Sequence, residues 1–172
     1  MDHPRPGLKY VAVDDLDRSK KSFQNFAVDD PAGEKLGKLE GFILNTTKAI
    51  PYYVVVNAGS WFRTKHVLIP IGHVALDSES KKLIADVPKE RVKRFPGFDL
   101  NLFPQLTPED LDRMAEEIAA VCCPDLVIVP GEMISRVEVW AHYRTPAWWE
   151  TSFYTERART GEAAPSDAEW RR

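Results

Sequence analysis

Residues 51–57, PYYVVVN, are the stretch that decides the fold class of this chain. The run is apolar without alternation and rich in β-branched and aromatic side chains, which is typical of a strand covered on both faces. Before it, Gly33, Gly37 and Gly41 interrupt an alternating pattern, as in strands with tight turns or bulges. Further short strands are predicted at residues 65–70, 73–77 and 81–87. The chain is therefore expected to be mainly β, as a small barrel or sandwich.

Two histidines flank the apolar run HVLIPIGHV, residues 66–74. Pro70 removes a donor from the ladder, so we expect one strand to end there and another to begin near His73. A metal site needs further ligands at suitable spacing, and the two other histidines of the chain lie in irregular stretches. We interpret His66 and His73 as structural residues and predict no metal site.

Two short helices are predicted after these strands. The first lies in PKERVKRF, residues 88–95, before a Pro-Gly stop. The second begins after Thr107, a residue type favoured as an N-cap, and ends before Pro124. Its apolar stripe is expected to cover an open end or flank of the barrel. The stripe consists of Leu111, Met114, Ile118 and Val121.

The bulk properties of the 172 residues narrow the function classes. A net charge of −3 and a pI of about 5.8 argue against nucleic acid as a partner, because phosphate binding needs a concentrated basic face. No apolar run has the length of a membrane helix, and the N-terminus does not have the pattern of a secretory signal. The expected location is the cytoplasm. The two cysteines, Cys122 and Cys123, are adjacent, and we interpret them as structural.

Motifs for catalysis are not found in this sequence. The glycines of GEKLGKLEG, residues 33–41, are spaced by four and are not followed by a helix, so they match neither nucleotide-binding pattern. No serine lies in an elbow motif, and the paired acids lie in turn contexts, where Asp often binds the backbone. We therefore predict a non-enzymatic protein without catalytic residues or cofactor.

Aromatic residues are concentrated after the second helix, in VEVWAHYRTPAWWETSFY, residues 137–154. One interpretation is an arm that docks on a partner or a second subunit, since Trp and Tyr are favoured at interface hot spots. The other is an arm that folds back over its own barrel, and both stay open. Trp61 and Phe62 raise the same choice. The candidate partner-binding residues are Trp140, Tyr143, Trp148, Trp149, Phe153, Tyr154, Trp61 and Phe62.

The order of DDPAGEKLGKLEGFILN, PYYVVVN, KHVLIPIGHVALD and KKLIADVPKERVKRFPGFD resembles a PRC-barrel domain over residues 23–99. That family is similar in architecture to the cytoplasmic domain of the photosynthetic reaction-centre H subunit and to the second domain of a ribosome maturation factor. The resemblance implies a small β-barrel that binds other proteins, with no shared catalytic residues. This sequence lacks the membrane helix of the first relative and the separate N-terminal β-domain of the second.

The predicted organisation is a PRC-type β-barrel followed by two short helices and an extended aromatic C-terminal arm. The expected segments are an N-terminal extension at 1–22, the barrel domain at 23–99, a capping helix at 100–123, the arm at 124–156 and a disordered tail at 157–172. Residues 125–134, DLVIVPGEMI, are a further strand candidate. The main hypothesis is an adaptor or peripheral cytoplasmic subunit of a larger, membrane-embedded assembly such as a reaction centre. A ribosome-assembly factor and a stand-alone homo-oligomer are the alternatives.

Overall fold

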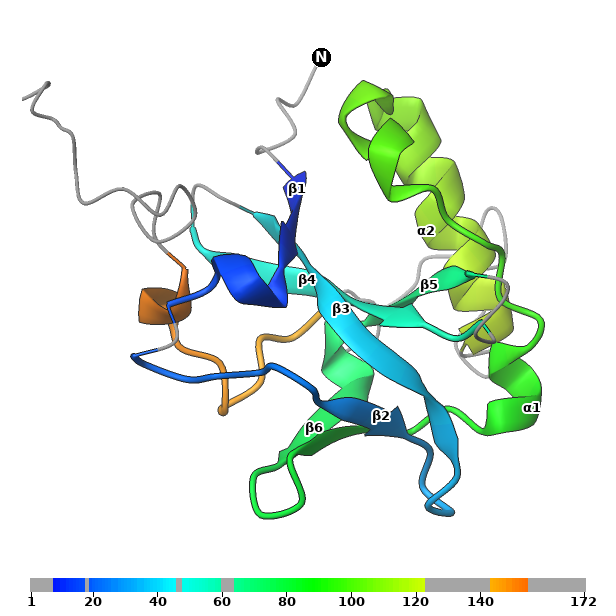
Figure 1. The fold of residues 1–172 in the computed structure, drawn as a ribbon. Coiled ribbons are helices and arrows are strands. Elements are labelled where there is room, and N and C mark those ends of the chain that lie inside the picture. The colour runs from blue at the N-terminus through cyan, green and yellow to red at the C-terminus, as the bar shows by residue number, and fades with distance from the viewer. Residues whose placement is uncertain (1–7, 18, 46–47, 60–63, 123–142, 155–172) are drawn as a thin grey trace, which may run out of the picture.

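The computed structural model describes residues 8–17, 19–45, 48–59, 64–122 and 143–154. These residues form a mainly β structure with two short helices, drawn in Figure 1. The strands are β1 (Leu8–Ala12), β2 (Ala27–Asp29), β3 (Lys35–Asn45), β4 (Ile50–Asn57), β5 (His66–Pro70), β6 (Val74–Asp77) and β7 (Lys82–Ala85). The α-helices are α1 (Lys89–Val92) and α2 (Pro108–Cys122), and the 3-10 turns are η1 (Val13–Asp15), η2 (Ile71–His73), η3 (Leu100–Gln105) and η5 (Thr151–Phe153).

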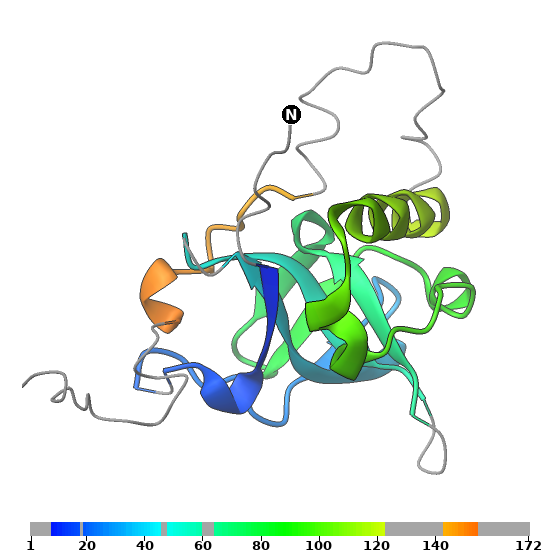
Figure 2. The same ribbon diagram turned by 90° about the horizontal axis from the view of Figure 1, so that it is seen from above.

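The seven strands make one mixed sheet with β3 at its centre. Six strands follow the order β5-β4-β3-β2-β7-β6, and β1 pairs with β3 beside that path. Every pair is antiparallel except β2 with β7. The strands β1 and β2 share one edge of β3, while β4 takes the other edge. The register of β3 against β4 shifts twice, and such irregularities bend a strand, so the sheet curls as Figures 1 and 2 show.

The predicted strand at residues 51–57 is confirmed as β4, and both of its faces are covered. Val54, Val55 and Val56 each have 0% of their surface exposed, although successive strand residues point to opposite faces. Val54 is paired with Phe42 of β3, on the inner face of the curled sheet. Val55 is paired with Leu68 of β5, on the outer face, which α2 flanks.

The interruption that Pro70 predicts is confirmed. Strand β5 ends at Pro70, the turn η2 follows, and β6 begins at Val74. Strands β5 and β6 do not pair with each other but form the two ends of the strand path. Among the described strands the sheet is therefore curled but not closed by hydrogen bonds, so the predicted β-barrel is confirmed only as a mainly β, curled sheet. The physical reason is the turn η2, which carries the chain away from the β5 edge.

The N-cap predicted for the second helix is confirmed at Thr107. The backbone N–H of Asp110 donates to Oγ1 of Thr107 at 3.1 Å, and the backbone N–H of Thr107 donates to Oδ2 of Asp110 at 3.0 Å. This reciprocal pair satisfies donors that a helix start leaves open. The first helix is shorter than predicted: α1 covers only Lys89–Val92, and Pro88 precedes the helix in an extended conformation.

Asp30 ties the β2–β3 turn to the start of α1. Its Oδ1 accepts the backbone N–H groups of Ala32 at 2.9 Å and Glu34 at 2.8 Å, and its Oδ2 accepts that of Lys89 at 3.2 Å. These hydrogen bonds, the one from Glu34 above all, lower the pKa of Asp30 below its usual value. Asp30 therefore serves the backbone, as the sequence pattern indicated. Its neighbour Asp29 instead accepts a hydrogen bond from Nζ of Lys82 at 2.8 Å.

The N-terminal extension contains the strand β1, which pairs with residues 41–45 of β3. Val11 is 1% exposed and belongs to the core. On the other face, the ring of Tyr10 lies over Gly41 of β3, and a Cβ on Gly41 would collide with the backbone oxygen of Val11. Burial, with a smaller effect of the nearby carboxylate of Glu40, raises the pKa of Tyr10 to about 12. The N-terminal extension thus contributes a strand to the sheet.

Candidate protein-interaction surface

The aromatic segment at residues 143–154 lies against the chain's own domain. Trp149, Phe153 and Tyr154 are only 4–5% exposed, and Trp148 is half-buried. The indole N–H of Trp149 donates to the carbonyl of Ala49 at 2.8 Å, in the turn between β3 and β4. These contacts hold the segment across the end of the sheet where β4 begins.

A second indole holds the same segment to β6, the last strand of the path. The N–H of Trp148 donates to the carbonyl of Val74 at 3.2 Å, at the start of β6. The two neighbouring tryptophans therefore connect the β3–β4 turn to β6. Side chains, in place of a hydrogen-bonded ladder, cover this flank of the open sheet.

The rings of the segment continue the core of the inner face. Phe42 of β3 and Phe153 each lie 5.1 Å from the ring of Trp149, and Phe153 lies 5.8 Å from Phe23, all edge-to-face. Such pairs add to the stabilisation from burial. At the start of the segment, the hydroxyl groups of Tyr53 and Tyr143 lie 2.8 Å apart, and burial raises the pKa of Tyr143.

The folded-back interpretation therefore describes the arm from residue 143 to residue 154. These side chains use their large surfaces inside the domain, which leaves mainly Trp148 and Tyr143, both half-buried, with surface for a partner. The other candidate residues, Trp140, Trp61 and Phe62, lie outside the described residues. So do the predicted strand at 125–134 and the predicted tail at 157–172.

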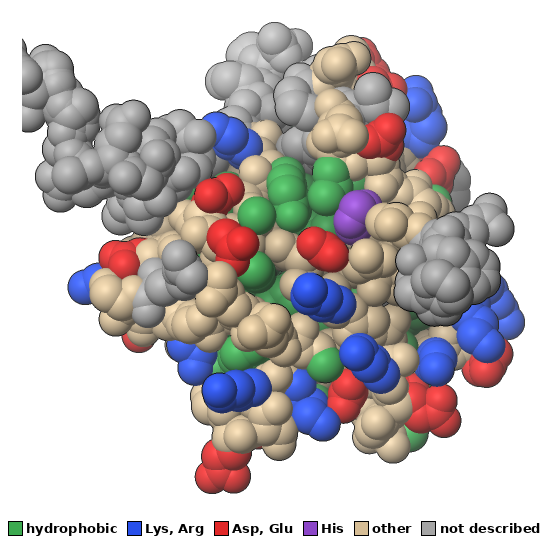
Figure 3. Space-filling model, in the orientation of Figure 1, with side chains coloured by type: hydrophobic (Ala, Val, Ile, Leu, Met, Phe, Trp, Pro, Cys, Tyr) green, Lys and Arg blue, Asp and Glu red, His purple; other side chains and the backbone are tan. Residues whose placement is uncertain are grey.

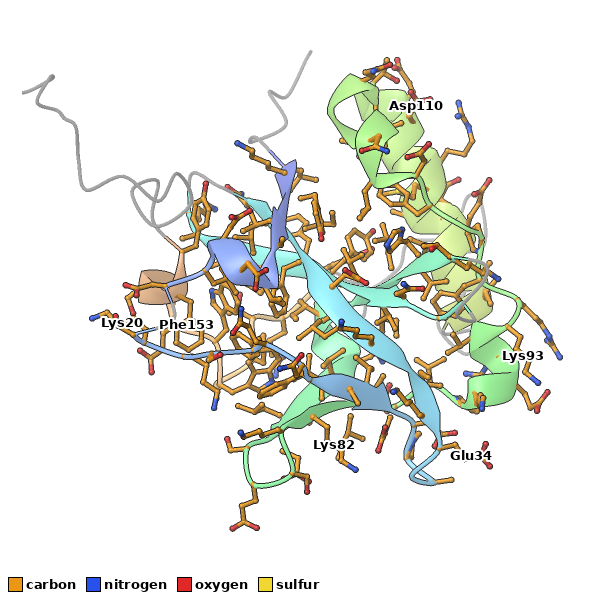
Figure 4. All side chains as sticks on the ribbon, in the orientation of Figure 1. Lys20, Glu34, Lys82, Lys93, Asp110 and Phe153 are labelled. Atoms are coloured by element: carbon orange, nitrogen blue, oxygen red, sulfur yellow. The ribbon has the colours of Figure 1, made fainter. Side chains whose placement is uncertain are left out.

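A groove on the other flank of the domain lies between α2, strand β5 and residues 96–98, which follow α1. It has a volume of about 330 Å³. Asp110, at the start of α2, and Phe153 of the aromatic segment lie on opposite flanks (Figure 4), so this groove and the arm are separate surfaces. We call it the α2 groove; its lining residues are Leu68, Pro96, Gly97, Phe98, Leu106, Asp110, Arg113, Met114, Glu117 and Ile118.

The apolar stripe of α2 is only partly covered by the domain. Ile118 is 2% exposed, but Leu111, Met114 and Val121 remain half-buried. On the face drawn in Figure 3, hydrophobic side chains gather between β1 and α2, where the outer face of the sheet meets the helix. The predicted capping role of this helix thus leaves apolar surface open, and surface of this kind marks interaction sites.

The charged residues of the α2 groove are Asp110, Arg113 and Glu117, which lie within about two turns of α2. Arg113 contacts Oδ1 of Asp110 at 3.1 Å. The hydrogen bonds from Thr107, followed by the one from Arg113, lower the pKa of Asp110. Within the described part of the chain, Glu117 has no ion-pair partner, so it carries the uncompensated charge of the groove wall.

The two histidines of the opening run are not brought together with other metal ligands in the parts that the structure describes. Nδ1 of His73 lies 2.8 Å from Oδ1 of Asp86, whose side chain is 66% exposed. This carboxylate lies at the surface of the domain. His66 begins β5, where its carbonyl accepts the backbone N–H of Phe98 at 2.9 Å.

A second hollow, lined by described residues, is mainly polar. It has a volume of about 280 Å³ and lies beside η1 and the middle of β3. Gln24 donates to Asp14 there at 2.6 Å, so these side chains satisfy each other. The α2 groove is the hollow with an apolar lining, which is the property that binding sites for apolar groups share.

The described residues thus form a curled, mainly β sheet with α2 on its outer face and a groove beside this helix. Residues 20–92 match the family model of the PRC-barrel domain. The family indicates a protein-interaction module. No curated protein matches the chain. The described residues contain no helix that is long and apolar enough to cross a membrane.

Sequence reasoning found the stripe on α2 but not the groove beside it. Phe98 and Leu106, which line the opposite wall, lie in segments without periodicity. The available signal was the combination of a helix with an apolar stripe and many acidic residues. A helix of this kind on a small sheet has a face that the domain itself does not fully use.

Proposed function

We propose that this protein is a non-catalytic interaction module that acts as an adaptor or a peripheral subunit of a larger assembly. The observation that carries the proposal is the α2 groove, where Met114 and Leu111 of an amphipathic helix stay half-buried beside a folded core. A partner side chain that enters this groove gains apolar contact without any rearrangement of the sheet.

The absence of a catalytic role is part of the same proposal. His73 pairs with the surface carboxylate of Asp86, and Asp30 is engaged by three backbone N–H groups. These observations support binding in preference to catalysis.

A more specific form of the proposal is a subunit on the cytoplasmic face of a membrane-embedded complex, such as a photosynthetic reaction centre. The family resemblance supports it, because the cytoplasmic domain of the reaction-centre H subunit has this architecture. A ribosome-assembly role is the alternative within the same class. The net charge of −3 favours a protein partner over ribosomal RNA.

Photo-crosslinking in cells of the native host tests the proposal. A photoreactive amino acid replaces Met114 in the α2 groove, Ala147 on the exposed side of the aromatic segment, or Glu79 in the exposed β6–β7 turn as the control. We expect a discrete crosslinked protein from position 114 and none from position 79. Crosslinks from position 147 only would move the partner surface to the aromatic arm.

The same experiment separates the alternatives. Crosslinked ribosomal proteins, with co-sedimentation of the chain with ribosomal subunits, would support ribosome assembly. A crosslink to a second copy, together with a dimeric mass in solution, would support a homo-oligomer. The adaptor proposal fails if all three positions give the same weak background under conditions in which the protein is folded.

A further inference from the structure

The helix α2 is strongly acidic compared with the rest of the chain. Its sequence, PEDLDRMAEEIAAVC, contains five carboxylates against one arginine, a formal charge of −4. The whole chain has a charge of only −3. Among the described helices and strands, α2 therefore carries the most negative formal charge, and it forms one side of the groove.

Part of this charge is already compensated within the helix. Asp110 receives the backbone N–H of Thr107 and a guanidinium N–H of Arg113, whose N–O distance is 3.1 Å. Glu116 and Glu117 are both exposed and have no ion-pair partner in the described part of the chain. Of these two, Glu117 lines the α2 groove.

The basic residues near the groove do not compensate Glu117. Lys93, which directly follows α1, contacts Glu90 of that helix at 3.6 Å. Lys65 donates to the backbone carbonyl of Lys93 at 3.3 Å. Neither lysine lines the groove, whose charged lining consists of Asp110, Arg113 and Glu117.

We propose that the α2 groove binds a basic amphipathic segment of a partner protein, with one large apolar side chain in the groove and a Lys or Arg beside Glu117. The proposal rests on the proposed function and names the chemistry of the partner. The groove, at about 330 Å³, is at the small end of ligand pockets and suits one or two anchor side chains. The exposed carboxylate of Glu117 on the groove wall then pairs with the basic residue of the partner.

Charge also decides against a second copy of this chain as the occupant. A symmetric pair of α2 faces would bring two helices of formal charge −4 against each other. Each Glu117 would face carboxylates and only one guanidinium, Arg113, which Asp110 already holds. Like charges in close contact oppose association.

Random peptides of about twelve residues displayed on phage and selected on the full-length chain test this inference. Binding of the synthetic consensus peptide is then measured by titration. We expect an apolar anchor with Lys or Arg within four residues. The variant Glu117→Lys should weaken binding about tenfold, Glu117→Gln about threefold, and Glu79→Lys not at all, because Glu79 lies in the distant β6–β7 turn.

A charge exchange gives the sharpest readout. A peptide in which Glu replaces the basic residue should lose affinity for the wild-type chain and regain it for Glu117→Lys. The variant Met114→Glu should abolish binding of both peptides while the protein still unfolds cooperatively. Selected peptides with acidic or neutral flanks, or equal affinity for all Glu117 variants, would overturn the inference.

Failure of this inference differs from failure of the proposed function. If position 114 crosslinks a partner while the selected peptides show no basic preference, the interaction module stands and the partner chemistry is wrong. If the chain's own residues fill the groove, Met114→Glu will lower stability by several degrees and no selected peptide will depend on position 114. That outcome also overturns the inference.

Discussion

Replacement of Trp149 by alanine tests whether the aromatic segment is part of the folded domain. Trp149 is 5% exposed, lies edge-to-face with Phe42 and Phe153 at 5.1 Å, and donates to the carbonyl of Ala49. Loss of a buried aromatic side chain costs about 3–5 kcal/mol. The hydrogen bond contributes about 1 kcal/mol of this loss.

The free energy of unfolding is measured by urea titration, followed by far-UV circular dichroism. For Trp149→Ala we expect a loss of about 3–5 kcal/mol, which corresponds to a fall in Tm of roughly 6–20 °C. Trp149→Phe keeps a ring but removes the donor, so its loss should be about 1–2 kcal/mol. Glu150→Ala, at the exposed neighbouring position, is the control and should change stability by less than about 0.5 kcal/mol.

A loss below about 1 kcal/mol for Trp149→Ala would refute the reasoning. It would mean that the segment at 143–154 does not contribute its rings to the core in solution. The aromatic residues would then be available to a partner, and the docking interpretation of the arm would be favoured.

Three further predictions concern local structure. Gly41→Ala should cost at least about 1–3 kcal/mol, because the added Cβ meets the backbone of Val11, and hydrogen exchange in β1 should accelerate. Thr107→Ala should cost about 1 kcal/mol, since the N-cap of α2 is lost. Asp30→Asn should destabilise the chain at neutral pH. The pKa of Asp30 is lowered in the folded state, so the ionised carboxylate stabilises the fold at higher pH and this contribution is lost as the pH falls through the folded pKa. The difference in stability between wild type and variant should therefore shrink at low pH.

Each of these predictions has a contrary result. Unchanged exchange in β1 would mean that Gly41 is not required for the close approach of the strands. Full stability of Thr107→Ala would mean that Asp110 alone satisfies the helix start. A stability difference between wild type and Asp30→Asn that stays constant below pH 4 would show that the carboxylate charge is not what the backbone donors stabilise.

The strands were predictable where local patterns determined them. The uninterrupted apolar run of β4 predicted burial on both faces, and Val54 and Val55 confirm it. Pro70 predicted the end of β5, since proline cannot donate to a ladder. Thr107 predicted the start of α2 because a threonine hydroxyl can accept a backbone N–H that the first turn of a helix leaves without a partner.

The features that were not predictable depend on contacts between distant residues. The donors of Trp148 and Trp149 meet the carbonyls of Val74 and Ala49, which are 74 and 100 residues earlier in the chain. Nothing in the local sequence of the aromatic segment shows whether its side chains contact the same chain or another protein. The open sheet has the same origin, because whether β5 and β6 pair depends on the path of η2 and not on either strand.

The α2 groove was half-predictable for a related reason. The stripe of Leu111, Met114, Ile118 and Val121 follows from helical periodicity alone. How much of it stays uncovered depends on Phe98 and Leu106, which irregular segments position. The candidate site therefore required the tertiary structure.

The pairing of β1 with β3 determines where the chain can be truncated without exposing the sheet. The family match begins at residue 20, whereas β1 ends at Ala12. A chain trimmed to the matched segment would leave residues 41–45 of β3 with bare backbone donors and acceptors. It would also expose Phe42, which β1 and the aromatic segment bury together. Such an edge is a template for pairing between molecules, so the trimmed domain should self-associate into aggregates from which the full-length chain is protected.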